Sequence, residues 1–520
     1  MTAGALALGL GACSDDGGGS AASTTRDSAA GSSTSVAEAA TPSGSPVGPD
    51  GIAVADLPGE DEIFGWISEI FDQGIRRTGY PADEWAEQWV AERFTEFGLS
   101  EVHAEPFAAK RWEPGECKLE VTPEGGQTRT VPCFPVPFST PTPDGGLDLA
   151  LVHLDAASPA PVGGQAALVD VALIEVPADM MGYGGSAPPD ATDRVVDPDG
   201  TLAGSGHLLP FGTEFMGVMD SAIDGGAAAF IGALRDYPGD SFEYFVPYDA
   251  LSRPIPGVWI SNSSADELDR DLAAGPVSVR MVVSAETTEV ETNNIVGFLD
   301  GADDEVVMIA SHHDGPWASA VEDSSGMALV LAQAHYWSKR PVEERPHKMV
   351  FLMQGGHMSG GAGLLAYIDA HRDELDDVVL EVHLEHAALE TEVVDGEVVA
   401  TDVPVPRWFF TSRIPVLEKT VFDALSAEEL GRSMVVAPDA FGEQPPTDGA
   451  MYHREGVPVV NFLTAPFYLF DSMDTLDKVD RAHLVPLTRA TIRIVNSTAG
   501  ETAAGLRSQV EQSTEDVAAG

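Results

Sequence analysis

The sequence predicts an α/β fold, in which a mixed β-sheet is sandwiched between helices and a β-rich domain is inserted before the main sheet. Short apolar runs of strand length, such as 306–310 and 349–353, alternate with helical runs in the last part of the chain, and this alternation is typical of α/β sheets. In the middle of the chain, short strand-like segments follow one another between Gly- and Pro-rich turns. These two patterns predict two architectures in one chain.

The charge of the chain limits its partners. Of 520 residues, 83 are acidic and 28 are basic, which gives a formal net charge of −55. This charge repels phosphate backbones, so we expect no nucleic-acid partner. The hydrophobic content of 43% supports a sizeable core, and a polar tail is expected over 501–520. No run of transmembrane length follows the N-terminal segment.

The first residues resemble a bacterial lipoprotein leader. The sequence Leu-Gly-Ala-Cys at 10–13 follows a run of small apolar residues, as in a lipobox, and 14–57 is rich in Gly, Ser, Thr and Ala. The resemblance implies a signal peptide over 1–13, lipidation of Cys13, a disordered tether, and an extracytoplasmic protein that contacts the membrane through its lipid anchor only. The alternative is an incidental cysteine in a disordered N-terminus. In an oxidising compartment, Cys117 and Cys133 could form a disulfide across a hairpin.

Histidine and carboxylate side chains follow the strand at 306–310. His312 and Asp314 come directly after it, and alternate residues of an extended chain share a face, so both side chains are expected on one side. A metal-bound histidine usually donates its other N–H to an oxygen, and Asp314 is placed to accept that bond. Glu322 and Asp323 come next, just before a helical run. This edge is where open α/β sheets carry their chemistry.

The order of elements over 289–500 resembles the M28 family of zinc aminopeptidases and carboxypeptidases. The N-terminal helices over 58–111 would complete that domain. The block 112–288 resembles a protease-associated domain, with 225–231 and 255–260 matching its signature strands; a generic β-rich insertion is the alternative. The resemblance implies a zinc-exopeptidase-like fold, two zinc ions bridged by one Asp, and a Glu as general base. The inserted domain implies substrate gating or protein contact.

Compared residue by residue, the resemblance implies that one zinc site is kept and its neighbour is lost. His312 takes the ligand position of the family's G-H-x-D, Glu322 that of the bridging Asp, and Glu385 that of the Asp in L-D-M. Met358 and Phe470 stand where the family has a Glu and a His ligand, and neither a thioether nor a phenyl ring suits zinc. We therefore expect one zinc ion, bound by three protein ligands and open at a fourth position.

His357 replaces the general-base Glu of the family's G-G-E-E. An imidazole in this position could act as general base or bind the metal as a fourth ligand. Asp323 could take the bridging position instead of its neighbour. His383 shares a strand face with Glu385 and is a reserve ligand, whereas His386 is expected to face the opposite side.

Three functions remain open at this point. The first is a lipid-anchored metallo-aminopeptidase that cleaves an amide bond of a peptide or small amide substrate, with His357 and Asp314 as catalytic residues. The second is a catalytically degenerate M28-like protein that binds peptides or an envelope partner. The third is an acidic lipoprotein that binds a solute or cation. Neither HExxH nor GxSxG occurs, so thermolysin-like and serine-hydrolase mechanisms have no support.

Overall fold

The structure is a computed structural model. It describes residues 45–49, 51–156, 161–178, 194–212, 217–442 and 444–510. Cys13, the predicted leader and most of the predicted tether lie outside these residues. Among the described helices, none has the length and apolar character that a membrane span requires.

Parallel strands form the centre of the main sheet. In spatial order they are β12 (Lys348–Gln354), β11 (Val306–His312), β13 (Val378–Leu384) and β18 (Val459–Leu463). The antiparallel strand β16 (Arg407–Thr411) follows, then β17 (Ser433–Val436) and β6 (Val195–Val196). Almost every residue of the four parallel strands is buried, as expected for a sheet covered on both faces. The predicted α/β fold with a mixed sheet is confirmed.

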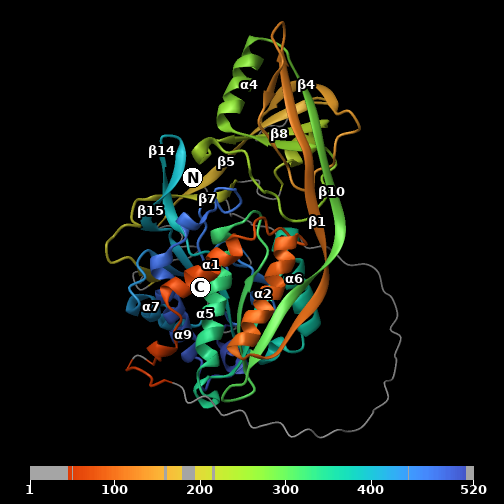
Figure 1. Ribbon diagram of the computed structural model, residues 1–520. Helices are drawn as coiled ribbons and strands as arrows, with labels where there is room; N and C mark the ends of the chain where they lie inside the picture. Colours follow the sequence, from red (N-terminus) through yellow and green to blue (C-terminus); the bar gives the residue numbers. More distant parts are fainter. Residues whose placement is uncertain are drawn as a thin grey trace, which may run out of the picture.

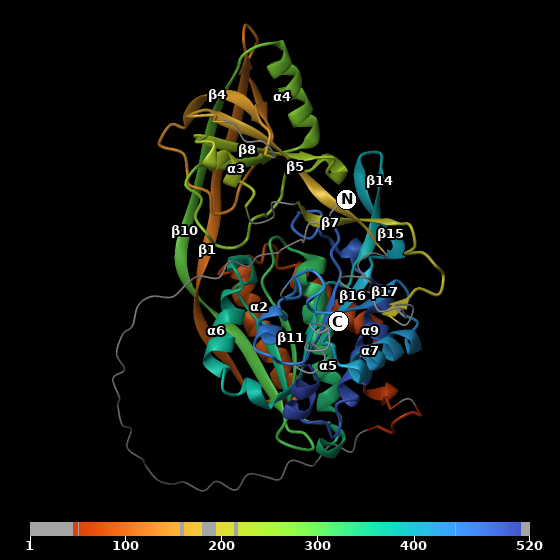
Figure 2. The same ribbon diagram turned by 180° about the vertical axis from the view of Figure 1, so that it is seen from behind.

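Helices cover both faces of this sheet (Figures 1 and 2). One face packs on α1 (Glu60–Phe71), α2 (Pro81–Phe97), α5 (Gly326–Ser338), α7 (Pro415–Ala427) and α9 (Leu484–Asn496). The other face packs on α6 (Ala362–His371) and α8 (Ala450–Arg454). Neighbouring strand residues divide between the faces: Ile309 belongs to the first core and Met308 to the second. This alternation follows from the two-residue period of a strand.

The helical pattern over 61–99 is interrupted in the structure. α1 ends at Phe71 and α2 begins at Pro81, whose fixed φ suits a first helical position. The predicted end at Gly98 is confirmed, since Gly98 has φ 87° in the left-handed region. The segment between the helices carries Arg76, which is fully buried and donates from Nε to the His313 carbonyl at 2.9 Å. The break therefore fixes the loop that follows β11.

Two long strands connect the main sheet to the inserted region. β1 (Ser100–Pro123) and β10 (Val277–Leu299) pair antiparallel and rise together from the helical body to the upper part of the molecule (Figures 1 and 2). The upper part contains β3 (Phe134–Pro135), β9 (Gly257–Ile260), β8 (Ala229–Arg235), β5 (Ala166–Pro177), β4 (Leu147–Leu154) and α4 (Asn262–Ala274), and β7 (Gly206–Gly212) pairs with β5. The boundaries predicted at 111/112 and 288/289 fall inside β1 and β10, so the backbone is continuous there.

Cys117 on β1 lies opposite Cys133, which follows β2 (Arg129–Val131). Their Sγ atoms are 3.3 Å apart and both are thiols in the structure. A bonded pair would have its sulfurs about 2.05 Å apart, so the disulfide stays a prediction.

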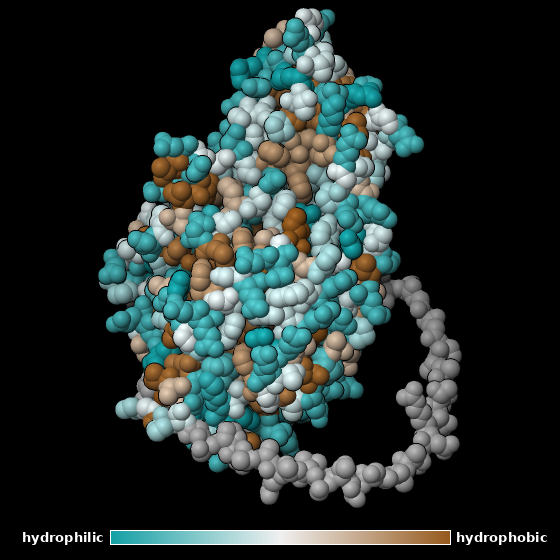
Figure 3. Space-filling view, viewed as in Figure 1, coloured by the Kyte–Doolittle hydropathy of each residue, from teal (hydrophilic) through white to brown (hydrophobic). Residues whose placement is uncertain are grey.

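A separate hairpin, β14 (Leu389–Val394) and β15 (Glu397–Pro404), projects beside the inserted region. Val393, Val394 and Val403 are between 43% and 53% exposed on it. In Figure 3, hydrophobic surface lies at the place of this hairpin, near the upper left of the body.

Candidate metal centre

The carboxyl ends of the parallel strands bring the site residues together. β11 ends at His312 itself, the turn after β12 carries His357, and the segment after β13 carries Glu385 and His386. Parallel strands end at the same edge of a sheet, so residues far apart in sequence meet there. Glu322 reaches this edge from the loop before α5.

Two imidazoles face one carboxylate oxygen at this edge. His312 Nε2 lies 3.6 Å from Glu322 Oε1, and His357 Nε2 lies 3.7 Å from the same oxygen. The two imidazole rings stack with centroids 4.1 Å apart and planes 11° from parallel. One ligand atom from each of the three residues lies within 4.8 Å of the others, and this is the one such group found in the described part of the chain. The arrangement could hold a metal ion.

Oxygen acceptors orient both rings. His312 Nδ1 lies 2.8 Å from the backbone carbonyl of Asp314, and His357 Nδ1 lies 2.8 Å from Asp448 Oδ1. Carbonyl and carboxylate oxygens can only accept, so each Nδ1 carries the hydrogen and donates it. Each Nε2 is then the nitrogen that faces Glu322 and could bind a metal, which is the usual arrangement around metal-ligating histidines.

The chemistry of the buried atoms fits a metal ion. His312 Nε2 and Glu322 Oε1 are buried without a hydrogen-bond partner, and burying such atoms unpaired is costly. Two imidazoles and one carboxylate, with a fourth position open, are a known donor set for catalytic zinc. His312, Glu322 and His357 therefore fit a zinc ion.

The protonation states of two of these residues agree with that fit. Burial, with the charge of His357 beside it, lowers the pKa of His312 to about 4, so its Nε2 lone pair is available at neutral pH. Burial would raise the pKa of Glu322, but His386 and the other two imidazoles outweigh it and hold the pKa at about 2. Glu322 is therefore a carboxylate at any ordinary pH.

Asp314 orients His312 as expected, but through its backbone carbonyl and not through its carboxylate. Its carboxylate lies 3.9 Å from His312 Nδ1, and its backbone carbonyl accepts the bond instead. Its carboxylate accepts from Thr78 Oγ1 at 2.7 Å and from the backbone N–H groups of His357 and Met358 at 3.0 and 2.9 Å. β11 ends at His312, so the strand alternation used for the prediction stops before Asp314. Asp314 positions the His357 turn.

Glu385 lies beside the centre and outside the three-residue group. Its Oε1 accepts from the backbone N–H of Asp448 at 3.1 Å and lies 3.4 Å from His383 Nε2. Burial raises its pKa. His383 Nδ1 lies 3.0 Å from Glu381 Oε1, so its ring bridges two carboxylates behind the centre. The structure thus places His357, rather than Glu385, next to His312 and Glu322.

Asp323 is held by neighbouring backbone and hydroxyl groups. Its Oδ1 accepts from the N–H of Gly326 at 3.2 Å and of His386 at 3.1 Å, and Ser311 Oγ donates to Oδ2. Its Oδ2 remains 3.9 Å from His312 Nε2. Burial raises its pKa to about 8. These contacts make Asp323 a support of the loop before α5.

Two residues of the site were not found from the sequence. His386 was expected to face away, but its Nε2 contacts Glu322 Oε2. The strand β13 ends at Leu384, and His386 has φ 51°, so the backbone turns and alternation no longer applies. Asp448 accepts a hydrogen bond from His357 Nδ1 although the two residues are 91 positions apart in the sequence. No local sequence signal pairs residues with that separation.

Met358 and Phe470 stand where the M28 resemblance implies the ligands of a second metal. Met358 and Phe470 are buried, with 1% and 5% exposed. The Phe470 ring lies 5.1 Å from that of Tyr248, which in turn stacks on His357 at 5.1 Å. Tyr248 belongs to the inserted region, so this region forms part of the wall of the centre.

No family model and no curated protein matches this sequence. Solved structures match the fold. A peptidase M28 precursor from Shewanella amazonensis SB2B has 20% identity and a TM-score of 0.63, over 84% of this chain and 93% of that chain. A zinc aminopeptidase from Bacillus subtilis has 16% identity and a TM-score of 0.61, over 87% of this chain and 99% of that chain. An aminopeptidase from Aneurinibacillus sp. strain AM-1 has 17% identity and a TM-score of 0.54, over 85% and 94%.

The chain has the fold of the M28 zinc peptidases. The similarity spans both the main sheet and the inserted region, since more than four-fifths of this chain is covered in each comparison. At these identities the shared property is the fold, so the chemistry of this chain rests on its own side chains.

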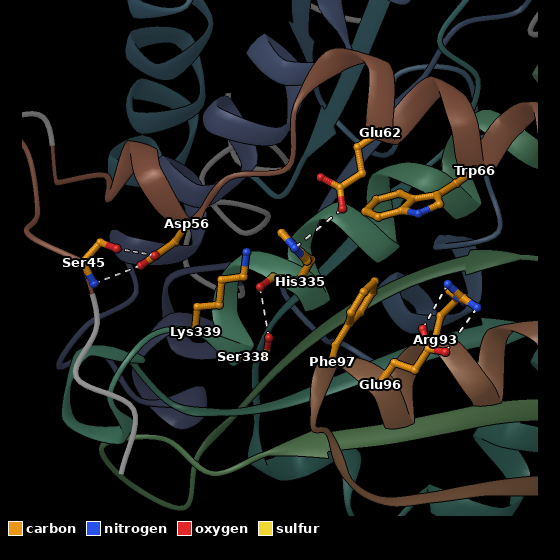
Figure 4. A pocket seen from close by; sticks show the side chains of 10 residues that line it. All are labelled: Ser45, Asp56, Glu62, Trp66, Arg93, Glu96, Phe97, His335, Ser338 and Lys339. Carbon is orange, nitrogen blue, oxygen red and sulfur yellow. Dashed lines mark hydrogen bonds and ion pairs between the residues drawn. The ribbon is translucent and has the colours of Figure 1, made fainter. Parts of the chain in front are cut away.

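A surface hollow of about 610 Å³ lies away from the centre, lined by residues of α1, α2 and α5 (Figure 4). Trp66 and Phe97 flank His335 in it. Glu62 lies 3.9 Å from His335, and Arg93 pairs with Glu96 at 3.0 Å. None of the predicted site residues lines this hollow, so we assign it no catalytic role.

Proposed function

We propose that this protein is an M28-type metallohydrolase, an exopeptidase that removes the N-terminal residue of a peptide with a single zinc ion. The observation that carries the proposal is the convergence of His312, Glu322 and His357 on one point at the strand ends. The fold of zinc aminopeptidases supports the substrate class. The N-terminal lipobox at Cys13 supports a lipid-anchored, extracytoplasmic location, which we include in the proposal.

The side chains have separable roles. His312 and His357 would each give an Nε2 lone pair to the ion, and Glu322 one oxygen. Zinc, when bound, polarises a substrate carbonyl and makes water acidic enough to attack near neutral pH. Asp448 keeps the hydrogen of His357 on Nδ1, and Asp314 fixes the turn that carries His357. Tyr248 and Phe470 limit the entry of bulk water beside the ring of His357.

Proton transfer requires a base other than His357, because His357 as a ligand cannot also be the base. We propose Glu385 for this role. Its Oε1 is held by the Asp448 N–H and it is only 3% exposed. Burial raises its pKa, which brings it closer to the range of an effective general base.

The second candidate is a catalytically degenerate protein that binds peptides or an envelope partner. The observation that favours it is the enclosure of the centre. The side chain of Glu322 is 1% exposed, and that of His357 is only 13% exposed.

One experiment separates the two candidates. Purified protein is assayed against aminoacyl-anilides and short peptides, and its metal content is measured on the same sample. The enzyme predicts about one zinc per chain and hydrolysis that His312→Ala abolishes. The control is His347→Ala, because His347 is equally buried but lies before the other end of β12 and binds Asp303 and Thr498. A metal-free, inert protein supports the binding function.

A further inference from the structure

His386 lies against the carboxylate of the proposed metal ligand Glu322. We propose that His386 is a positioning residue: it holds one oxygen of Glu322 and so leaves the other oxygen for a single metal ion. The inference rests on the metal site proposed above. It adds a residue outside the ligand group and explains why the centre would take one ion.

Each nitrogen of the His386 ring faces an oxygen. Nδ1 lies 2.8 Å from the carbonyl of Thr464, and Nε2 contacts Glu322 Oε2. The carbonyl can only accept, so Nδ1 donates to it, and Nε2 is the nitrogen that faces the carboxylate. His386 lies outside the three-residue group whose ligand atoms converge. It therefore acts on Glu322 from beside the ion site.

The backbone aims this ring at Glu322. The His386 N–H donates to Asp323 Oδ1 at 3.1 Å, and its carbonyl accepts from Thr464 Oγ1 at 2.7 Å. The next residue, Ala387, donates to Ser325 Oγ at 2.8 Å. With φ at 51°, His386 has a left-handed backbone conformation just beyond the end of β13. The side chain is 6% exposed, so water cannot readily replace it.

The two oxygens of Glu322 thus have different neighbours. Oε1 faces His312 and His357 at 3.6 and 3.7 Å, distances that leave room for an ion between them. Oε2 is taken by His386. The Glu322 backbone is fixed as well, since its N–H donates to Asp474 Oδ2 at 2.8 Å. A carboxylate held in this way presents one oxygen to one ion, and partners of a ligating carboxylate typically contribute 10–100-fold to metal affinity.

Two amide substitutions separate the bonds of His386. The Asn amide in His386→Asn reaches the position of Nδ1 and can still donate to Thr464, but it is too short to reach Glu322. The longer Gln amide in His386→Gln reaches the position of Nε2 and can donate to Glu322 Oε2. His347→Asn, at the other end of β12, is the control for loss of a buried imidazole.

Cobalt(II) binding to the full chain is measured by equilibrium dialysis and by visible absorption. We expect one Co²⁺ per wild-type chain, a Kd raised about 10–100-fold with an altered spectrum in His386→Asn, and a Kd within about threefold of wild type in His386→Gln. His347→Asn should bind as wild type. Circular dichroism and thermal denaturation of each apo-protein show whether it is folded.

Each outcome decides a specific claim. If the wild type binds one ion and His386→Asn binds it as tightly or more tightly, the positioning role is overturned while the proposed metal site stands. If His386→Gln is weakened as much as His386→Asn, a donor returned to Glu322 Oε2 does not restore metal binding, which also overturns the positioning role. Two tightly bound ions in the wild type contradict the division of the carboxylate. A wild type that binds no cobalt or zinc overturns both proposals.

Discussion

Replacing Asp448 with Asn removes the charge that orients one of the proposed ligands. Asp448 Oδ1 accepts from His357 Nδ1 at 2.8 Å, and the two side chains are 11% and 13% exposed. Opposing the effect of burial, His357 lowers the pKa of Asp448, so the pair is ionic in the metal-free protein. Asn has the same size but no charge, and loss of such a partner typically weakens metal binding 10–100-fold. This corresponds to about 1.4–2.7 kcal/mol.

The zinc-dependent gain in stability measures this loss. At a free zinc concentration 100 times the wild-type Kd, binding stabilises the folded wild type by about 2.7 kcal/mol. At the same concentration, a Kd raised tenfold leaves about 1.4 kcal/mol and one raised 100-fold about 0.4 kcal/mol. Unfolding is measured with zinc and with a chelator for each protein. Any change in the stability of the apo-protein then cancels.

Asp303→Asn is the matched control for this experiment. Asp303 accepts from His347 Nδ1, also at 2.8 Å, but this pair lies before β11 and β12, at the opposite end of the sheet from the centre. The zinc-dependent gain should stay at about 2.7 kcal/mol in this variant. An Asp448→Asn protein with the full wild-type gain would refute the reasoning, because His357 would then not be a metal ligand oriented by Asp448.

Three further changes test the fold around the centre. Burial raises the pKa of Asp471 from 3.8 to about 7. The Asp471 carboxyl therefore binds its proton more tightly in the folded state than in the unfolded chain. The free energy of unfolding falls as pH rises from about 4 to 7. Asp471→Asn should therefore be roughly 2–4 kcal/mol more stable than wild type at pH 8 and similar near pH 4; equal denaturant midpoints at pH 8 would contradict this. A Cβ on Gly363 would lie 2.2 Å from the backbone oxygen of Gly355 in the Gly-rich turn, so Gly363→Ala should lose about 1–3 kcal/mol of unfolding free energy and bind zinc more weakly. Gly65→Ala has open space in α1 and should gain about 0.5–1 kcal/mol of unfolding free energy. Unchanged unfolding and zinc binding in Gly363→Ala would show that the turn adapts. If Cys117 and Cys133 pair, reduction should cost about 3 kcal/mol, and intact mass should show two hydrogens fewer before reduction; alkylation of both thiols without a reductant would show that they are free.

Much of the fold could be predicted from the sequence, because its signals are local. The apolar runs 306–310 and 349–353 are buried strands in the structure, and their hydrophobic periodicity requires only neighbouring residues. The left-handed residue at Gly98 ends α2 as expected. The break between α1 and α2 was missed, although Gly74 and Gly79 lie between the two helices and Pro81 begins the second.

The site was predicted in part. His312 and Glu322 lie together, since one ends β11 and the other begins the loop before the next helix. His357 was foreseen as a base or a fourth ligand, and it lies in the ligand group. The preference between His357 and Glu385 could not be read from the sequence, because both side chains are held by Asp448, which lies more than sixty residues away from either.

The sequence by itself determined which residue types reach the edge of the sheet, and therefore that imidazoles and carboxylates could meet there. Only the tertiary structure decided which atoms face one another. Side-chain direction follows strand alternation only while the strand lasts, and His386 lies beyond its end with a positive φ. Its contact with Glu322 joins segments more than sixty residues apart, so it exists only once the sheet has assembled.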